Sequence, residues 1–163
     1  MKYLIVILVF FSSSLHAKDT SILFDPSLNE QEVCLVQAIY FEARGETLGG
    51  QLAVANVILQ RVSNKYFPNT ICKVVKSGRY FKGSPVKNRC AFSYWCDGKP
   101  ERMYDKLSYK RALKVKDLAL NGSVIVTINK ATHYHALYVN PKWAKEMKKL
   151  SQIGKHIFYK WFT

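Results

Sequence analysis

Residues 39–46 read Ile39-Tyr40-Phe41-Glu42-Ala43-Arg44-Gly45-Glu46, and they contain the most informative carboxylate of the chain. Glu42 has apolar and aromatic neighbours, near the expected end of a helix with a buried face. Desolvation there disfavours the charged carboxylate and raises its pKa, as a general acid at neutral pH requires. An ion pair with Arg44 would oppose this shift, and a solvent-facing or purely structural Glu42 is the alternative. For Glu46, a capping or ion-pair role is favoured over chemistry.

Helices extend outward from this stretch in both directions. Ser27 and Glu30 match the capping box S-x-x-E, which predicts a helix over residues 29–44. Gly45 is a natural stop for that helix. Apolar residues recur at helical spacing along it. Similar patterns predict three further helices, over residues 48–62, 71–76 and 107–121.

The rest of the chain is less regular. Residues 77–104 are rich in Gly, Pro and aromatic residues, which predicts an irregular lobe with room for a small hairpin. Loops of that length in a compact domain are usually functional. Residues 124–128 are β-prone, residues 141–150 suggest a helix, and residues 157–162 suggest a terminal strand. The expected fold class is mainly α (α+β), in a single domain with a small β element and a long loop lobe.

Composition limits the class of protein. The chain has 163 residues, 48% hydrophobic and 22% charged, so it is neither disordered nor of low complexity. This length suits one domain. The 25 Lys and Arg residues outnumber the 11 Asp and Glu residues, for a net charge of +14. That balance predicts an anionic partner, with a merely solvated surface as the alternative.

The first residues have the layout of a secretory signal peptide. Lys2 precedes an apolar run over residues 3–11, and small or polar residues follow up to Ala17. This run is too short for a bilayer core, which needs about 20 residues. We therefore expect a signal peptide over residues 1–17, a lead-in over 18–28 and one domain over 29–163. Export to the periplasm or the extracellular space disfavours nucleic acid as the partner and favours an anionic envelope polymer.

The four cysteines, an even number in a chain expected to be exported, suggest two disulfides. Cys90 and Cys96 flank a short loop, which favours their pairing and leaves Cys34 with Cys72. A zinc site is the alternative, although the spacing C-x5-C matches no common zinc motif.

Two other stretches carry candidate functional groups. Residues 90–98 place a hydroxyl, three aromatic rings and a carboxylate in one short loop. Sugar rings stack on such aromatic side chains, and a small satellite core is the alternative. Residues 133–135 read His-Tyr-His, which suits hydrogen bonding to a ligand or half of a metal site. The chain contains no G-x-S-x-G, P-loop or H-E-x-x-H motif. Chemistry therefore rests on carboxylate and histidine.

Several co-linear motifs carry a family resemblance. They are residues 39–46, Gly50–Val62 (GQLAVANVILQRV), Phe67–Ile71 (FPNTI), Phe92-Ser93, Asp97-Gly98, Ala131–Tyr134 (ATHY) and Ile153–His156 (IGKH). In these residues the chain resembles the SleB/CwlJ-type cell wall hydrolases, named for the spore cortex-lytic enzymes. The resemblance runs from Cys34 to Phe158.

The resemblance implies a lysozyme-like, lytic transglycosylase-like fold that acts on peptidoglycan. We expect the protein to need no cofactor and to be a monomer. Glu42 takes the position of the family's catalytic acid, so one carboxyl group would serve as both acid and base. The expected substrate-binding residues are Glu46, Ser93, Tyr94, Asp97, His133, Tyr134 and His135.

Two other functions remain open. In a zinc-dependent N-acetylmuramoyl-L-alanine amidase, the metal ligands would be His133, His135 and His156, and Glu42 would activate water. A non-catalytic envelope-binding protein would use the positive charge and the tyrosines for contact.

Overall fold

The computed structural model describes residues 23–161, and the predicted signal peptide lies outside them. The α-helices are α1 (Glu30–Ala43), α2 (Leu48–Val62), α3 (Ile71–Val75) and α4 (Lys106–Leu120). The strands are β1 (Gly78–Phe81), β2 (Ser84–Cys90), β3 (His133–Ala136), β4 (Lys148–Ile153) and β5 (His156–Lys160). Three 3₁₀-helices complete the fold: η1 (Ser93–Cys96), η2 (Val126–Ile128) and η3 (Lys142–Glu146). Within the described residues, no helix is both long and apolar enough to cross a membrane.

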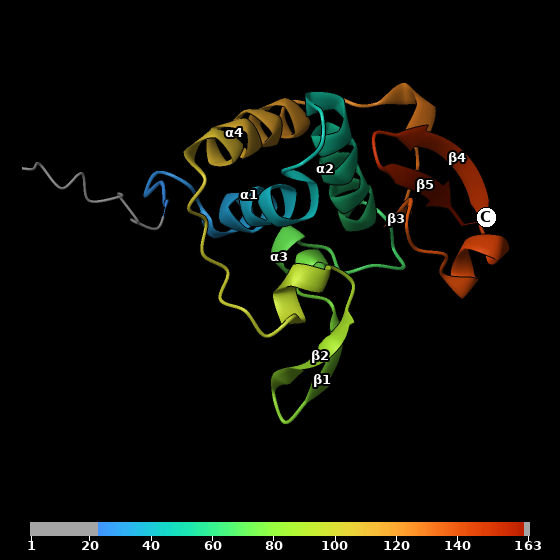
Figure 1. Ribbon diagram of the computed structural model, residues 1–163, viewed down its shortest axis with the longest axis horizontal. Helices are drawn as coiled ribbons and strands as arrows, with labels where there is room; N and C mark the ends of the chain where they lie inside the picture. The colour runs from blue at the N-terminus through green and yellow to red at the C-terminus, as the bar shows by residue number, and fades with distance from the viewer. Residues whose placement is uncertain (1–22, 162–163) are drawn as a thin grey trace, which may run out of the picture.

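Helix α2 lies at the centre of the molecule, because its apolar residues surround nearly the whole helix. Val54, Ala55 and Ile58 face a core that α2 shares with α1, α3 and α4. Ala53 and Val57 face a second core beneath the three-stranded sheet, which contributes Phe158 to it. Figure 1 shows the helices on one side of α2 and the sheet on the other. Four of the five predicted helices and the mixed fold class are confirmed.

The capping box of α1 begins two residues later than the sequence predicts. Asn29 is the N-cap, and its side chain accepts a hydrogen bond from the backbone N–H of Glu32, whose carboxylate accepts one from the N–H of Asn29. The predicted box of Ser27 and Glu30 is wrong, since the Ser27 hydroxyl donates to Asp25 within a preceding turn. The sequence matches both S-x-x-E, at Ser27 and Glu30, and N-x-x-E, at Asn29 and Glu32. The turn that holds Ser27 decides between the two patterns.

The three-stranded sheet has the order β3-β5-β4 and is antiparallel throughout. Tyr134 pairs with Phe158, and Ala136 pairs with His156. Because side chains alternate along a strand, these four residues share one face of the sheet. Phe158 packs against α2, so Tyr134 and His156 face the helices.

Two predictions for the C-terminal third are wrong. Residues 126–128 form a 3₁₀-helix in place of a strand, because Asn56 of α2 accepts from the backbone N–H of Ile125 and donates to the carbonyl of Ser123. The predicted helix over residues 141–150 is a short 3₁₀-helix followed by strand β4. Pairing with β5 determines the conformation there, a tertiary contact that outweighs local propensity.

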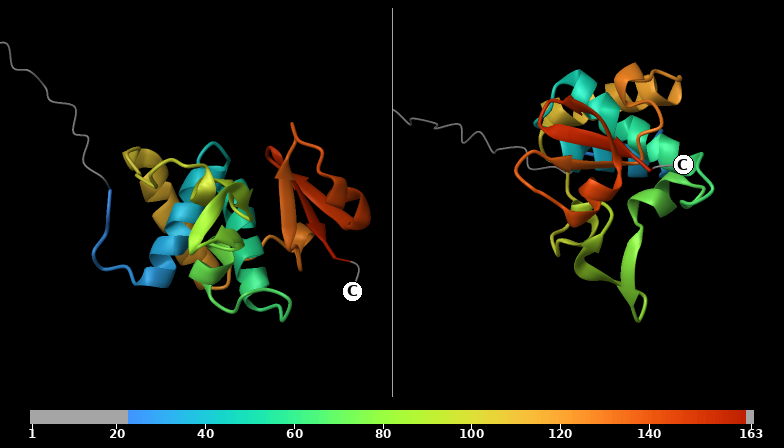
Figure 2. Two further views of the ribbon diagram at one scale, coloured as in Figure 1. Left: turned by 90° about the horizontal axis from the view of Figure 1, so that it is seen from below. Right: turned by 90° about the vertical axis from the view of Figure 1, so that its right-hand side faces the viewer.

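Strands β1 and β2 form a hairpin that projects away from the helices (Figures 1 and 2). It lies within the predicted irregular lobe. Both predicted disulfides are confirmed: Cys34–Cys72 joins α1 to α3, and Cys90–Cys96 joins β2 to η1.

Candidate active site

Three segments far apart in the sequence meet at the carboxyl group of Glu42. Glu42 lies in the last turn of α1 and is partly buried. The Ser93 hydroxyl, from η1, donates a hydrogen bond to Glu42 Oε1 at 3.4 Å. The Tyr134 hydroxyl, from β3, donates to Glu42 Oε2 at 3.3 Å. Each carboxylate oxygen therefore has its own hydroxyl donor.

Burial is the main influence on this carboxyl group, and it raises the pKa of Glu42. The hydrogen bonds from Tyr134 and Ser93 and from the backbone N–H groups of Tyr94 and Ser93 oppose that rise in pKa, because they stabilise the ionised form. Such a group holds its proton more tightly than an exposed glutamate does, and protein dipoles solvate it well after it has given the proton up. This combination suits a general acid that later acts as a base.

Tyr134 is a donor that stays protonated. Burial, together with the nearby Glu42 carboxylate, raises its pKa well above the ordinary value for tyrosine. Its ring also packs edge-on against His156, with 5.2 Å between ring centroids. The orientation of Tyr134 is therefore set by the sheet.

Sequence reasoning missed Arg61, a buried cation close to this site. Arg61 Nε donates to the carbonyl of Thr132 at 2.7 Å, and its guanidinium lies 5.3 Å from the ring centroids of both Phe67 and Phe92. Its charge favours the ionised forms of Glu42 and Tyr134. The only signal for it in the sequence is a single arginine among the apolar residues of α2.

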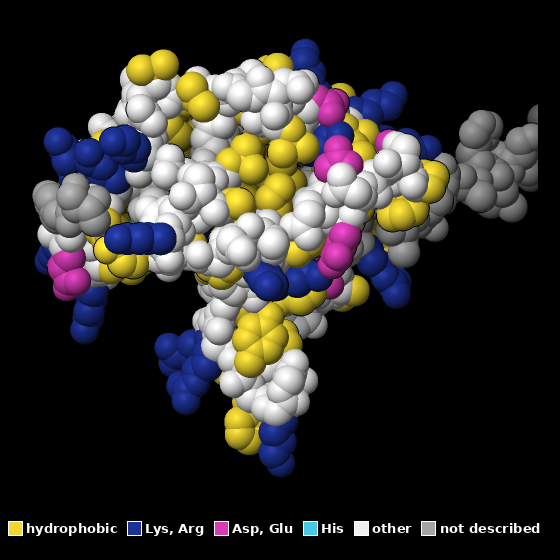
Figure 3. Space-filling model, turned by 180° about the vertical axis from the view of Figure 1, so that it is seen from behind, with side chains coloured by type: hydrophobic (Ala, Val, Ile, Leu, Met, Phe, Trp, Pro, Cys, Tyr) yellow, Lys and Arg dark blue, Asp and Glu magenta, His cyan; other side chains and the backbone are white. Residues whose placement is uncertain are grey.

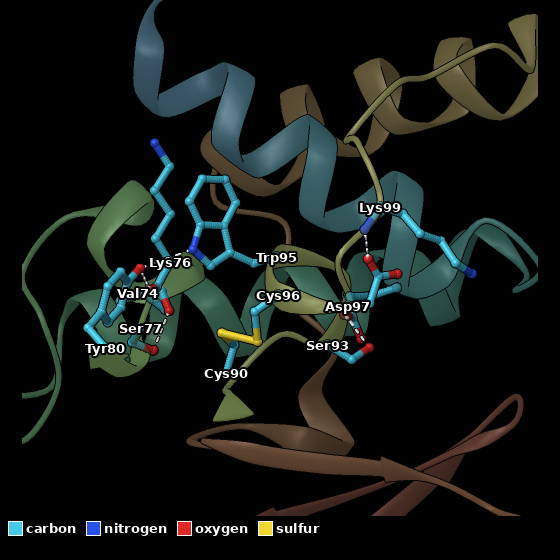
Figure 4. Close-up of a disulfide and its surroundings, with 11 residues drawn as sticks. Val74, Lys76, Ser77, Tyr80, Cys90, Ser93, Trp95, Cys96, Asp97 and Lys99 are labelled. Atoms are coloured by element: carbon cyan, nitrogen blue, oxygen red, sulfur yellow. Dashed lines mark hydrogen bonds between the residues drawn. A yellow bond between two sulfur atoms is a disulfide. The ribbon is translucent and has the colours of Figure 1, made fainter. Parts of the chain in front are cut away.

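A cleft of about 260 Å³ opens beside Ser93. Tyr94 of η1 and Asp97, the next residue after η1, line it on one side, and Phe41 and Arg44 line it from the end of α1. The Tyr94 ring stacks on Phe41 with 4.9 Å between centroids. The Asp97 carboxylate accepts the backbone N–H of Lys99 at 2.8 Å, and Figure 4 shows it near Ser93. The structure thus brings Ser93, Tyr94 and Tyr134 together around Glu42, and it places Asp97 in the cleft beside Ser93.

His133 and His135 lie on the opposite face of β3 from Tyr134. Both rings pack against Trp143, with centroids 5.4 and 5.7 Å away. His135 is also hydrogen-bonded to the Tyr159 hydroxyl at 2.9 Å. Burial and the charge of Arg61 lower the pKa of His133 to about 4, so this histidine is neutral at pH 7. Neither side chain reaches the Glu42 carboxyl group.

The sheet also separates the histidines that the amidase alternative requires. His156 shares the inner face with Tyr134, whereas His133 and His135 share the outer face. Among residues 23–161, no group of three His, Cys, Asp or Glu side chains is arranged to bind a metal ion. The proposed zinc ligands therefore do not converge.

Glu46 is enclosed by protein groups. Its Oε2 accepts the backbone N–H of Lys155 at 3.1 Å, and its Oε1 lies 3.8 Å from Nδ1 of His156. Burial lowers the pKa of His156, and the Glu46 charge opposes this effect. Glu46 thus joins the α1–α2 connection to the β4–β5 turn and does not contact Glu42.

Known proteins resemble this chain in sequence and in structure. The chain is 33% identical over 126 residues to a spore cortex-lytic enzyme of Bacillus cereus, which covers 77% of this chain and 42% of the relative. It is 35% identical over 129 residues to one from Halalkalibacterium halodurans, covering 76% of this chain and 33% of the relative. The chain therefore spans less than half the length of these curated relatives.

Two solved structures are similar as well. The catalytic domain of the Bacillus cereus SleB protein has a TM-score of 0.59 at 30% identity, covering 83% of this chain and 94% of that one. The catalytic domain of the germination-specific lytic transglycosylase SleB from Bacillus anthracis has a TM-score of 0.56 at 28% identity, covering 84% and 100%. The sequence model of the Cell Wall Hydrolase family matches residues 45–159. With the fold in common and most of its length matched, the chain belongs to the Cell Wall Hydrolase family.

Proposed function

We propose that this protein degrades peptidoglycan by cleaving the glycosidic bond between MurNAc and GlcNAc, as a lytic transglycosylase with Glu42 as its single acid and base. The observation that carries the proposal is the environment of the Glu42 carboxyl group. Burial raises its pKa, and its oxygens accept hydrogen bonds from the hydroxyls of Ser93 and Tyr134. The names of the similar proteins support the same substrate and reaction.

The reaction needs two proton transfers at one carboxyl group. Glu42 first gives its proton to the glycosidic oxygen, the bond from that oxygen to C1 of MurNAc breaks, and positive charge develops at C1. The Glu42 carboxylate then takes the proton of the MurNAc 6-hydroxyl, whose oxygen bonds to C1 and closes a 1,6-anhydro ring. Ser93 and Tyr134 stabilise the carboxylate between these steps. No water attacks, so the second carboxylate of an ordinary glycosidase is not required.

The remaining predicted residues take different parts in this proposal. Tyr94 and Asp97 line the cleft beside Ser93 and are placed to contact the sugars. His133, His135 and Glu46 bond to or pack against protein groups. Those contacts favour a role in which the three residues keep the sheet, and with it Tyr134, in position. These five assignments, like those of Ser93 and Tyr134, stay predictions.

The signal-like sequence of residues 1–17 supports export to the periplasm or the extracellular space, where peptidoglycan is accessible. Two disulfides support an oxidising compartment. We propose that the protein works there as a monomer, and that its charge of +14 favours a wall polymer over nucleic acid as its partner.

Mass spectrometry of the products from purified peptidoglycan tests this proposal. We expect the protein to release anhydro-muropeptides with or without a chelator. We expect Glu42→Gln to reduce the rate by at least about 1000-fold, because the amide cannot carry the proton. The matched control is Glu146→Gln, which makes the same change at an exposed carboxylate and should keep full activity.

Each other product would contradict the proposal in a distinct way. Muropeptides with reducing ends would identify a hydrolase that uses water, with Asp97 or Glu46 as the second carboxylate to examine. Free stem peptides that disappear on chelation would identify the amidase. Activity that survives Glu42→Gln would exclude Glu42 as the acid.

A further inference from the structure

The β1–β2 hairpin, residues 78–90, projects from the molecule with its side chains largely exposed. Together with Lys76 at its base, it carries five Lys and Arg residues and no Asp or Glu: Lys76, Arg79, Lys82, Lys87 and Arg89. Figure 3 shows this projection with basic and hydrophobic side chains and no acidic ones on the visible face. Phe81, near its tip, is 68% exposed, and Tyr80, whose hydroxyl bonds to Lys76 at the base, is 44% exposed. We call residues 76–90 the basic arm.

An ordered aromatic platform lies at the base of the arm. The Trp95 indole N–H donates to the Tyr80 hydroxyl at 3.0 Å, and that hydroxyl donates to the carbonyl of Lys76 at 2.6 Å. The Lys76 ammonium lies 5.0 Å from the centroid of the Trp95 ring. Figure 4 shows these three side chains gathered on one side of the Cys90–Cys96 disulfide. Fixed aromatic faces beside donors and cations are suited to sugar rings, because such rings present both C–H faces and hydroxyls.

The platform and the Glu42 site share one short element. η1 carries Ser93, which donates to Glu42, and Trp95, which belongs to the platform. The disulfide from Cys96 to Cys90 ties η1 to the arm. On the other side, a Cβ on Gly98 would lie 3.6 Å from Lys87 Cε, so an arm lysine borders the loop that lines the cleft. The arm therefore adjoins the loop that lines the cleft.

We propose that the basic arm is a second binding surface for the cell wall polymer, separate from the catalytic cleft. The Tyr80–Trp95 platform stacks against a sugar ring, and the arm's cations pair with free carboxylates of the peptide stems. The choice of partner follows from charge: the arm is purely cationic, and a glycan that bears carboxylate peptides supplies both the rings and the anions. This inference rests on the proposed function for its choice of substrate.

Co-sedimentation with purified, insoluble peptidoglycan tests the arm in the Glu42→Gln chain, so that the polymer is not consumed. We expect Arg79→Ala/Lys82→Ala to weaken binding about fivefold, and Tyr80→Ala about threefold, because exposed charge pairs and single stacking contacts are individually modest. The matched control is Lys110→Ala/Lys114→Ala, which removes two exposed cations from α4 and should leave the affinity within about twofold of the parent. Melting temperatures verify that each variant is folded.

Two results would overturn the inference. An equal loss of affinity in the arm and α4 variants would show that total charge alone attracts the polymer. If the arm variants bound phosphatidylglycerol vesicles more weakly than the parent but kept its affinity for peptidoglycan, the arm would be a membrane contact. Both results are independent of catalysis: if the chain with Glu42 intact releases no anhydro-muropeptides, the proposed function fails while the binding comparison stands.

Discussion

In the proposed mechanism, the Glu42 carboxyl group serves chemistry at a cost to stability. Burial favours its protonated form, and four hydrogen-bond donors partly compensate for the loss of water around the charged form. A folded-state pKa above the unfolded value means that the folded protein binds the proton more tightly. The contribution of Glu42 to stability is therefore fully present below pH 4.5 and is lost as the pH rises through the raised pKa.

We expect Glu42→Gln to stabilise the protein in a pH-dependent way. At pH 4 the variant and the parent should have similar free energies of unfolding, because both side chains are neutral. At pH 8 the variant should be more stable by about 1 kcal/mol, since the amide carries no charge to desolvate. Urea unfolding at the two pH values measures this difference. A difference that is the same at both pH values would contradict it, and Glu146→Gln, at an exposed position, is the control.

At the scale of the element, helix α1 illustrates how local hydrogen bonds fix the position of the acid. The Asn29–Glu32 capping box sets where the helix begins, and an ion pair of 3.0 Å between Glu32 and Lys116 joins it to α4. The Tyr40 hydroxyl accepts the backbone N–H of Asp105, the residue that caps α4. The last turn of α1, with Glu42, is thereby held against the rest of the helical core.

Asn29→Ala should therefore destabilise the protein by about 1 kcal/mol, the usual cost of losing an N-cap side chain. Ser27→Ala is the matched control, since Ser27 is the residue that sequence alone selects for the cap. Its hydroxyl makes an exposed contact with Asp25, so its loss should cost less than about 0.5 kcal/mol. Chemical denaturation of both variants measures the costs, and the reverse order would restore the cap to Ser27.

At the scale of the whole molecule, the site exists only where the helices and the sheet dock. Glu46, in the α1–α2 connection, bonds to the backbone of the β4–β5 turn at Lys155. Gly154 in that turn has φ of +56°, and a Cβ there would collide with Glu46 Oε2. Because β3 of the same sheet supplies Tyr134, we expect a change at this junction to alter the distance between Tyr134 and Glu42.

We expect Gly154→Ala to destabilise the protein by about 2 kcal/mol and to reduce activity, as it strains the turn and displaces Glu46. Gly122→Ala is the matched control: it has φ of +86° but open space around its Cβ position. It should cost about 1 kcal/mol and keep the activity of the parent. Thermal unfolding and peptidoglycan release measure the two effects, and equal losses in both variants would rule out a role for the junction.

The local structure of the helical half could be predicted from the sequence. The apolar spacing of α1, α2 and α4 and the stop at Gly45 are local signals, and the disulfide pairing followed from an even count and a short loop. Glu42 was also identifiable, because its apolar neighbours lie next to it in the sequence. Local propensity and periodicity operate over a few residues, so the chain alone determines such features.

Only the tertiary structure decided which side chains meet. Strand β4 forms because β5 pairs with it, and the alternation of β3 directs Tyr134 to Glu42 while it turns His133 and His135 away. Arg61 became part of the site through Thr132, a residue 71 positions away. These contacts depend on strand register and on the packing of the sheet against α2, and both arise from distant parts of the chain whose pairing no local pattern encodes.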